Sequence, residues 1–317
     1  MLPSNTPHRI SCWIVSEDLA GTRNQCLGVA EALGLAPDIK TITLKEPWKT
    51  CAPYLGWERA QSFSPSLLPP WPDLLIASGR KSIAASRYIK RASRGKTFTV
   101  QIQDPRISPR HFDLVAVPAH DPTRGKNVLV TMAAPNRITP ANLAVARAQF
   151  APLFESLPQP RIAVLIGGSS AAYTMTPQIM ETLAQQLKAL QGSLMITTSR
   201  RTGAENTAFL KSALKGPPHY FWEGSEPNPY MGLLAMADVI LVTADSTSML
   251  SEAATTGKPV YMIDLEGGTK RLNTMQENLI CYGAVRRFEG VVEQWTYQPL
   301  HDARIVAEAL RKKLGWI

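Results

Sequence analysis

The sequence predicts an α/β protein with two doubly wound, Rossmann-like domains that face a central cleft. Short apolar runs alternate with helical patterns in both halves of the chain, as expected for parallel βαβ units. The length of 317 residues also exceeds the size at which a single core usually stops growing, so two domains are expected.

In the first half, the apolar runs are short and end at small or polar residues, which is typical of buried strands. Strands are expected over residues 9–15, 39–44, 73–77, 97–102, 114–117 and 127–131. Helices are expected over residues 24–33, 83–93 and 140–157. The first helix ends at Gly34, because glycine commonly terminates helices. Residues 46–72 are rich in Pro and Trp without a clear period, so they are expected to be irregular with some helix.

The Pro-Gln-Pro sequence at 158–160 breaks the helical pattern and is the predicted hinge. The second half alternates again. Strands are expected from residue 161 and over 194–198, 219–222, 239–243 and 260–263, and helices over 177–190, 205–214, 230–236, 248–256 and 302–314. The predicted domains are 1–157 on the acceptor side and 158–300 for nucleotide-sugar binding. Residues 301–317 are expected to contain a C-terminal helix, and one option is that this helix packs back on the first domain.

The net charge of +9 is concentrated in the first half of the chain. Residues 1–158 hold 19 Lys or Arg and 11 Asp or Glu, an excess of 8 positive charges. A solvated face explains this excess, and so does an anionic partner, such as a membrane surface or a lipid-linked or acidic acceptor. The basic stretch has few interleaved aromatic residues and no nucleic-acid motif, so specific nucleic-acid binding is not expected.

The absence of several sequence patterns limits where the protein is expected and which cofactors it is expected to bind. The first residues lack the pattern of a signal peptide, and no window approaches the ~18 apolar residues of a membrane span. A cytoplasmic protein is therefore expected, with peripheral attachment to the inner membrane as an option. The four cysteines form no CxxC pair, and no DxD motif is present, so neither a metal nor another cofactor is expected.

Two segments of the second half each join an apolar strand to a loop of small residues and a helix. They are IAVLIGGSS at 162–170 and VILVTADSTSMLSEAATTGKP at 239–259. This arrangement presents free backbone N–H groups and helix N-termini at the carboxyl edge of a sheet, where phosphates bind. Ordinary tight turns and simple N-capping are the alternative interpretations. The candidate diphosphate-binding residues are Gly167, Gly168, Ser169, Ser170, Ser246, Thr247 and Ser248.

Basic residues lie close to the same predicted edge. Arg200 and Arg201 follow a strand, where a guanidinium can pair with phosphate or stack on a base, although a surface pair is equally compatible. Lys270 and Arg271 follow two glycines and are candidates to close over a diphosphate; a mobile basic loop is the alternative.

In the first half, polar residues follow several predicted strands and are expected to face the cleft. Asp18 is the candidate to take a proton from an acceptor hydroxyl. Asp104 and His120 are further catalytic candidates, with Asp121 placed to orient the His120 ring. Ordinary loop or helix-terminal roles are the alternatives. The candidates on the acceptor side are Gly21, Asn24, Gln25 and Arg106.

Several segments carry a family resemblance. They are SEDLAGTRNQCLGVAEALG at 16–34, IQDPR at 102–106, FDLVAVPAHD at 112–121, IGGSS at 166–170, TTSRRT at 197–202 and ADSTSMLSEAATTGKPV at 244–260. In these segments and their order, the chain resembles the mitochondrial fission protein ELM family over nearly its whole length. That family shares the GT-B glycosyltransferase fold, so the resemblance implies a GT-B-like architecture.

The last of these segments also resembles the sugar-nucleotide motif of GT-B enzymes. By that analogy, the Glu252 carboxylate accepts both ribose hydroxyls of a nucleotide, most simply of the UDP type. A dipole-complementing acid in the helix is the alternative. GT-B enzymes generally stabilise the leaving diphosphate with helix dipoles and basic side chains instead of a metal. One departure is Thr22, where family members usually carry a His. If that His is their general base, either another residue serves here or the catalytic assignment is wrong.

The resemblance implies a glycosyltransferase that moves a sugar from a nucleotide-diphosphate donor to an envelope or lipid-linked acceptor. A nucleotide-sugar epimerase is the nearest alternative. A non-catalytic membrane-division or interaction scaffold is the third, because the family name comes from organelle division and fold alone does not fix function.

Overall fold

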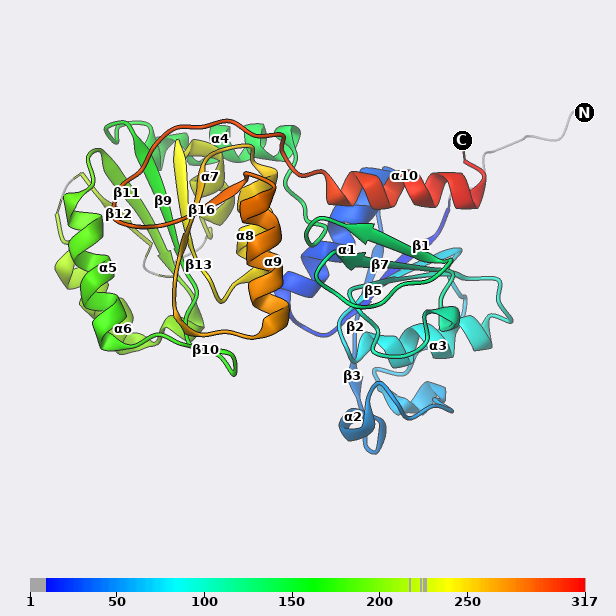
Figure 1. Ribbon diagram of the computed structural model, residues 1–317. Helices are drawn as coiled ribbons and strands as arrows, with labels where there is room; N and C mark the ends of the chain where they lie inside the picture. The colour runs from blue at the N-terminus through cyan, green and yellow to red at the C-terminus, as the bar shows by residue number, and fades with distance from the viewer. Residues whose placement is uncertain (1–9, 217, 223, 225–226, 317) are drawn as a thin grey trace, which may run out of the picture. The chain divides into compact units, whose positions relative to one another are not determined.

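The computed structural model describes residues 10–216, 218–222, 224 and 227–316 (Figure 1). The chain forms two compact units. Unit 1 combines the chain up to Arg137 with the segment from Asp302 onward, and unit 2 is Ile138–His301. Each unit is built on its own parallel six-stranded sheet.

The sheet of unit 1 has the order β2-β1-β5-β6-β7-β8, with parallel pairing throughout. Its strands are β1 (Cys12–Ser16), β2 (Asp38–Thr41), β5 (Leu74–Ser78), β6 (Phe98–Ile102), β7 (Leu114–Pro118) and β8 (Val128–Thr131). Its longer helices are α1 (Ala20–Leu33), α3 (Ser82–Ala92) and α10 (Asp302–Leu314). The Pro- and Trp-rich region contains β3 (Thr43–Leu44), α2 (Trp48–Cys51), η1 (Ala60–Ser62) and β4 (Phe63–Ser64), and η2 (Pro109–His111) precedes β7.

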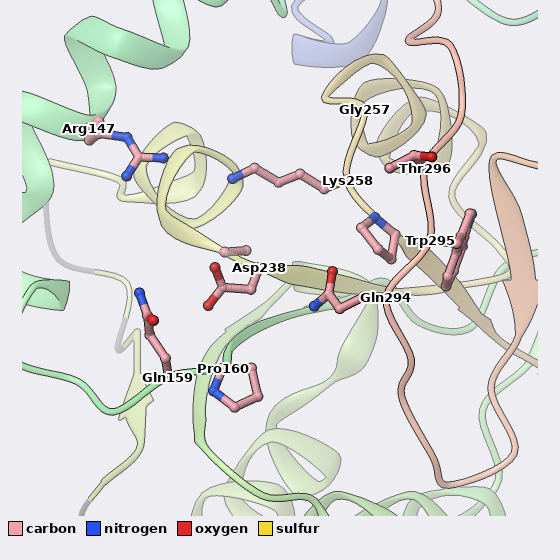
Figure 2. Close-up of a pocket in the computed structure, with 11 residues that line it drawn as sticks. Arg147, Gln159, Pro160, Asp238, Gly257, Lys258, Gln294, Trp295 and Thr296 are labelled. Atoms are coloured by element: carbon pink, nitrogen blue, oxygen red, sulfur yellow. The ribbon is translucent and has the colours of Figure 1, made fainter.

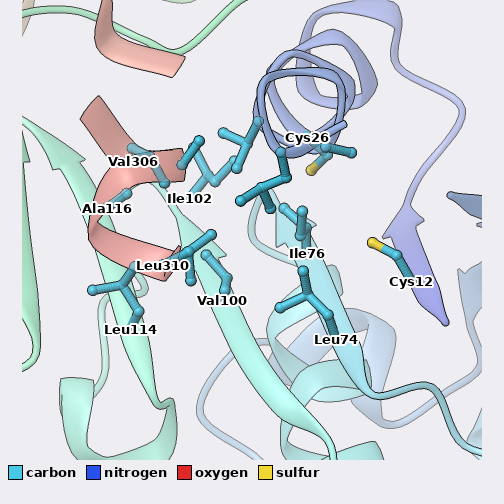
Figure 3. Packing of buried hydrophobic residues seen from close by; sticks show 14 of the residues in the cluster. Cys12, Cys26, Leu74, Ile76, Val100, Ile102, Leu114, Ala116, Val306 and Leu310 are labelled. Atoms are coloured by element: carbon cyan, nitrogen blue, oxygen red, sulfur yellow. The ribbon is translucent and has the colours of Figure 1, made fainter. Parts of the chain in front are cut away.

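Alternation along the strands gives unit 1 a core on both faces of its sheet. Leu74 and Ile76 of β5 belong to one buried cluster, whereas Leu75 belongs to the opposite one. Figure 3 shows the first cluster, in which Cys26 of α1 and Leu310 of α10 pack against the strands. Both layers are therefore apolar, and the strands appear in the sequence as nearly continuous hydrophobic runs.

Helix α10 completes the first of these clusters. Val306, Ala307 and Leu310 are fully buried in it, and α10 packs along α1. At its start, the Asp302 carboxylate accepts hydrogen bonds from the backbone N–H groups of Met132 and Ala133, at 2.9 and 3.0 Å. The last helix along the chain is thus an integral part of unit 1.

Unit 2 has the strand order β12-β11-β9-β13-β14-β16, again with parallel pairing. Numbered by position in the chain, this is the Rossmann order 3-2-1-4-5-6. The strands are β9 (Arg161–Ile166), β11 (Ser193–Thr198), β12 (Tyr220–Phe221), β13 (Val239–Thr243), β14 (Val260–Ile263) and β16 (Val285–Arg287). The doubly wound α/β fold predicted for both halves is confirmed.

The helices of unit 2 are α4 (Pro140–Phe154), α5 (Pro177–Ala189), α6 (Ala204–Ala213), α7 (Tyr230–Met236), α8 (Thr247–Thr255) and α9 (Lys270–Cys281), with the short η3 (Arg200–Thr202). Figure 1 shows α5 and α6 on one face of the sheet and α8 and α9 on the other. A two-stranded antiparallel ribbon, β10 (Tyr173–Thr174) with β15 (Glu266–Gly267), links the loops after β9 and β14.

Two features of unit 2 differ from the sequence predictions. Helix α4 packs on α7, where a Cβ at Gly232 would lie 2.6 Å from Phe150, so α4 belongs to unit 2 and the predicted hinge at 158–160 lies inside that unit. Lys270 and Arg271 begin helix α9, capped by the Thr269 side chain, instead of forming a loop.

Among the described residues, no helix is both long enough and apolar enough to cross a bilayer.

Candidate functional site

The central feature of unit 2 is the switch point of its sheet, between the neighbouring strands β9 and β13. From these strands the chain runs to opposite sides, so the loops at their carboxyl ends diverge and leave room for a ligand. The loop after β9 carries Gly167 and Gly168, and the loop after β13 carries Asp245 and Ser246.

The two glycines pack tightly against the second loop. The N–H of Gly167 donates to Thr243 Oγ1 at 2.7 Å, and the N–H of Gly168 donates to Asp245 Oδ2 at 3.1 Å. A Cβ at Gly167 would lie 2.3 Å from both carboxylate oxygens of Asp245, so a side chain is excluded there. The free N–H groups expected at these glycines are therefore already engaged within unit 2.

The two serines of the same loop also bond internally. The N–H of Ser169 donates to the carbonyl of Arg201, and that of Ser170 donates to the carbonyl of Tyr173. Ser169 Oγ accepts from the N–H of Met175, and Ser170 Oγ accepts from the N–H of Tyr173. Both side chains are nevertheless exposed, so each hydroxyl hydrogen can still be directed to a ligand.

Asp245 is a charged residue beneath this loop that the sequence analysis did not select. Its side chain is fully buried, and Oδ2 pairs with Arg201 Nη2 at 2.7 Å. Burial raises the pKa of Asp245, and the opposing effects of Thr243, Arg201 and the Gly168 N–H only reduce that rise. In the described part of the chain, Oδ1 has no hydrogen-bond partner. The sequence carries no local signal for Asp245, because its partners Gly168 and Arg201 come from other loops.

The N-terminus of α8 is the more open part of the switch point. Ser246 is the N-cap and its Oγ accepts from the N–H of Met249 at 3.4 Å. For Thr247 and Ser248, no hydrogen bond from the backbone N–H is found within the described residues. These two N–H groups lie at the positive end of a nine-residue helix, and both residues are partly exposed, which is a favourable place for an anion.

Glu252 lies further along α8 and is held by Tyr230 of α7. The Tyr230 hydroxyl donates to Glu252 Oε2 at 2.5 Å, and only 9% of Glu252 is exposed. Burial raises the pKa of Glu252 to about 7, and the hydrogen bond from Tyr230 opposes the rise. Burial, with the neighbouring carboxylate, raises the pKa of Tyr230 well above its ordinary value, so this hydroxyl remains a donor. Tyr230 is a partner that sequence reasoning missed.

The basic candidates of unit 2 occupy two different elements. Arg200 and Arg201 lie in η3, both exposed, and Arg201 is tied to Asp245. Lys270 and Arg271 are exposed in the first turn of α9. Gln276, deeper in α9, donates to Tyr173 Oη at 2.7 Å and to the carbonyl of Ala244 at 2.9 Å. These bonds tie α9 to both loops of the switch point.

In unit 1, Gln25 joins the carboxyl ends of two strands. Its Oε1 accepts from Ser78 Oγ at 2.9 Å and from Gln103 Nε2 at 3.0 Å, and its side chain is buried. On α1, Gly21 lies one turn before Gln25 and Asn24 directly precedes it, and both are half-buried. Thr22 Oγ1 donates to the carbonyl of Leu19, as expected for a residue early in a helix. Gln25 therefore organises this edge of the sheet.

The residues after β6 and β7 form a second network in unit 1. Asp104 Oδ1 accepts from Thr123 Oγ1 at 2.6 Å and from the N–H of Arg106 at 2.8 Å. The Asp104 N–H donates to Asp121 Oδ2 at 3.1 Å, and His120 Nε2 lies 3.5 Å from Asp121 Oδ1. The structure thus brings Asp104, Asp121 and His120 together. Because the His120 side chain is only 6% exposed, a substrate has little access to it.

Asp18 is separate from that network. Its side chain is 83% exposed, with Arg23 Nη1 at 3.6 Å. Next to it, Glu17 after β1 pairs with Lys81 after β5 at 2.6 Å across the switch point of this sheet, a pair that the sequence analysis did not select. Of the three catalytic candidates, Asp18 has the most accessible carboxylate.

The structure also has a cavity of about 660 Å³ at the opposite, amino edge of the unit 2 sheet (Figure 2). There, Lys258 Nζ donates to the carbonyls of Leu234 and Ala235, and Arg147 donates to the same Ala235 carbonyl. Burial lowers the pKa of Lys258 to about 8. Both cations thus cap the C-terminus of α7. In the described part of the chain, His, Cys, Asp and Glu side chains form no group of three or more able to hold a metal ion.

Comparison with known proteins places these features in a family. The model of the family described as Mitochondrial fission ELM1 matches residues 20–314. The chain belongs to this family. It is 34% identical over 284 residues to the Mitochondrial fission protein ELM1 of Arabidopsis thaliana, an alignment covering 77% of this chain and 65% of the plant protein. The chain thus spans less than two thirds of that relative's length.

Two solved structures with a similar fold hold nucleotide sugars. The UDP-GlcNAc 2-epimerase of Methanocaldococcus jannaschii, in complex with UDP-GlcNAc and UDP, is similar with a TM-score of 0.57 at 11% identity, covering 96% of this chain and 99% of the other. UGT71G1 of Medicago truncatula, complexed with UDP-glucose, is similar with a TM-score of 0.50 at 10% identity, covering 96% and 89%. At these identities the likeness shows the fold, which is GT-B-like as predicted.

Proposed function

We propose that unit 2 binds a nucleoside diphosphate sugar, most simply of the UDP type, and that the protein transfers the sugar to an envelope or lipid-linked acceptor. The observation that carries this proposal is the pairing of the open α8 N-terminus with buried Glu252 at the switch point. The helix start suits a diphosphate, and a carboxylate further along the helix suits the two ribose hydroxyls. The UDP ligands named for the two fold neighbours agree with this choice.

Each group at the site has a chemical task in this proposal. The N–H groups and hydroxyls of Thr247 and Ser248 stabilise the charge that develops on the leaving diphosphate. The α9 cations Lys270 and Arg271 contribute further positive charge. The serine hydroxyls of the first loop supply hydrogen bonds. Since Arg201 is already paired with Asp245, it serves the ligand only if that pair opens.

In this proposal, unit 1 binds the acceptor and provides the base. Asp18 takes the proton from the acceptor hydroxyl while that oxygen forms a bond to the sugar carbon and the bond to the diphosphate breaks. Its exposure supports this role over the enclosed His120 and over Asp104, whose carboxylate is held by Thr123. The basic surface of unit 1 suits an acidic acceptor or an anionic membrane surface.

Thermal shift with UDP, GDP, CDP, ADP and UDP-sugars tests the donor site. We expect stabilisation by one nucleotide family, with the dissociation constant raised at least about tenfold by Glu252→Gln, since hydrogen bonds to a charged group are worth about 1.5–3 kcal/mol. Glu205→Gln, on the exposed side of α6, is the matched control. Affinity should also rise with pH through about 7, because the ribose hydroxyls need the ionised carboxylate.

A non-catalytic scaffold is the second candidate. The engaged N–H groups of the Gly-Gly-Ser-Ser loop support it, because this loop needs no ligand to satisfy its backbone. If no nucleotide raises the melting temperature of the wild-type protein, the donor-site proposal fails and the scaffold takes its place.

A further inference from the structure

A second cavity, in unit 1, is lined by none of the candidate residues discussed above. It has a volume of about 410 Å³ and lies between the C-terminal half of α3, η2 and the segment between α2 and η1. Five of its lining residues are basic: Arg87, Lys90, Arg91, Arg110 and His111. Trp57 and Glu58 line it from the third side.

The base of this cavity is a rigid cluster of charges. The Glu58 side chain is fully buried and pairs closely with Arg87 Nη2, and it lies 3.5 Å from Arg91 Nη2. Arg87 also donates to the carbonyl of Leu55 at 2.7 Å, and Arg91 donates to that of Glu58 at 2.6 Å. These bonds fix the irregular segment on α3 and fix both guanidinium groups before any ligand arrives.

Positive charge nevertheless remains in excess. Lys90 pairs with Asp113 at 2.9 Å. Four Arg or Lys side chains thus face two carboxylates, those of Glu58 and Asp113, which leaves an excess of two positive charges without counting His111. Only 10% of the Arg87 side chain is exposed, and its Nε–H has no hydrogen-bond partner within the described residues. A buried donor without a partner is costly, so this cluster of cations carries unsatisfied hydrogen-bonding capacity as well as excess charge.

An aromatic ring stands at the edge of the same cavity. Trp57 is 87% exposed although its indole is large and apolar. Its backbone has φ of +59°, a left-handed conformation that is unfavourable for a tryptophan. The preceding carbonyl, that of Gly56, accepts from Trp48 Nε1 at 3.0 Å, which helps to hold this turn. The fold therefore maintains an exposed indole beside a cluster of cations.

We propose that this cavity binds a phosphate-bearing saccharide. The phosphate oxygens would accept hydrogen bonds from the guanidinium groups of Arg87, Arg91 and Arg110, because these planar groups match phosphate geometry. The Trp57 indole would lie against the apolar face of the sugar ring. This site is independent of the donor site in unit 2 and does not rest on the proposed transferase activity.

Calorimetric titration of the full chain with glucose 6-phosphate, glucose and inorganic phosphate tests this site. Glucose 6-phosphate should bind more tightly than inorganic phosphate, and glucose should not bind measurably. Arg110→Gln should weaken the binding of glucose 6-phosphate at least about tenfold, because one charge-assisted contact is lost. Trp57→Ala should weaken the binding of glucose 6-phosphate but leave the binding of inorganic phosphate unchanged. The exposed Lys126→Gln, also in unit 1, is the control and should change neither.

Vesicles of phosphatidylcholine with and without phosphatidic acid distinguish a lipid source of the phosphate from a saccharide. Vesicle binding that requires phosphatidic acid and is lost in Arg110→Gln, without a response to glucose 6-phosphate, would overturn the saccharide assignment. Binding of glucose 6-phosphate that is unchanged in both the Arg110 and Trp57 variants would overturn the site itself. So would a lack of binding by all these probes in a wild-type protein with a normal melting transition.

Discussion

The buried carboxyl of Glu252 makes the stability of unit 2 depend on pH in a definite direction. Its pKa is about 7 in the folded protein against an ordinary 4.5, because burial disfavours the charged form. A group whose pKa is raised by folding stabilises the fold below its unfolded pKa, and that contribution is lost as pH rises through the folded pKa. The gap from 4.5 to about 7 corresponds to about 3 kcal/mol of unfolding free energy.

Glu252→Gln removes this titration while keeping the side-chain shape and an acceptor for the Tyr230 hydroxyl. As the pH rises from 4.5 to 8.5, the free energy of unfolding of the variant should therefore increase by about 3 kcal/mol relative to that of the wild type. For a unit of this size, that gain amounts to a rise of roughly 6–12 °C in the melting-temperature difference. The assay is thermal melting of both proteins in a series of buffers from pH 4.5 to 8.5, with the difference plotted against pH.

Other groups titrate over this range, but they are common to both proteins and cancel in the difference. Glu205→Gln controls for the removal of one negative charge from the surface of the same unit. A Glu252→Gln difference that stays constant from pH 4.5 to 8.5 would refute the reasoning, since the carboxyl would then be ionised at little cost in the folded state.

Three further predictions concern packing and reactivity. Leu310→Ala should cost about 2–5 kcal/mol, seen as a lower urea midpoint for unit 1, because the side chain is fully buried; an unchanged midpoint would mean that α10 is not docked. Gly168→Ala should cost about 1–3 kcal/mol, since its Cβ would lie 2.1 Å from the Arg201 carbonyl; a neutral melting temperature would contradict this. Iodoacetamide should label only the two exposed cysteines of the native protein, because burial raises the pKa of the Cys12 and Cys26 thiols, and rapid labelling of all four would disprove their burial.

Most of the fold could be predicted from the sequence, because both sheets are parallel and covered on two faces. The runs at 74–78 and 239–243 are apolar throughout, since every side chain in them is buried. Helix α9 was missed because two glycines and Thr269 precede it and two basic residues begin it, a pattern that resembles a loop. The packing of α4 on α7 was not visible either, because a contact such as Gly232 with Phe150 joins residues far apart in the sequence.

The site could be predicted only in part, for a related reason. Short-range motifs point to the start of α8 and to Glu252, but they do not reveal what those groups contact. Asp245 and Tyr230 became visible only when the loops after β9 and β13 and helix α7 were seen together. Likewise, the sequence suggested free N–H groups at Gly167 and Gly168, whereas their acceptors, at the end of β13 and in the loop after it, lie more than seventy residues away in the sequence.

The place of α10 has a consequence for the order of folding during synthesis. Domains usually fold as units, with the N-terminal one first, as the chain leaves the ribosome. In this protein, Val306 and Leu310 fill the core of unit 1 but are made after all of unit 2. While unit 2 is being synthesised, the α1 face of the first sheet therefore lacks its cover and exposes apolar surface. The contiguous unit 2 can become native before the unit that precedes it, and a nascent chain stalled before residue 302 is the form most exposed to aggregation and most in need of a chaperone.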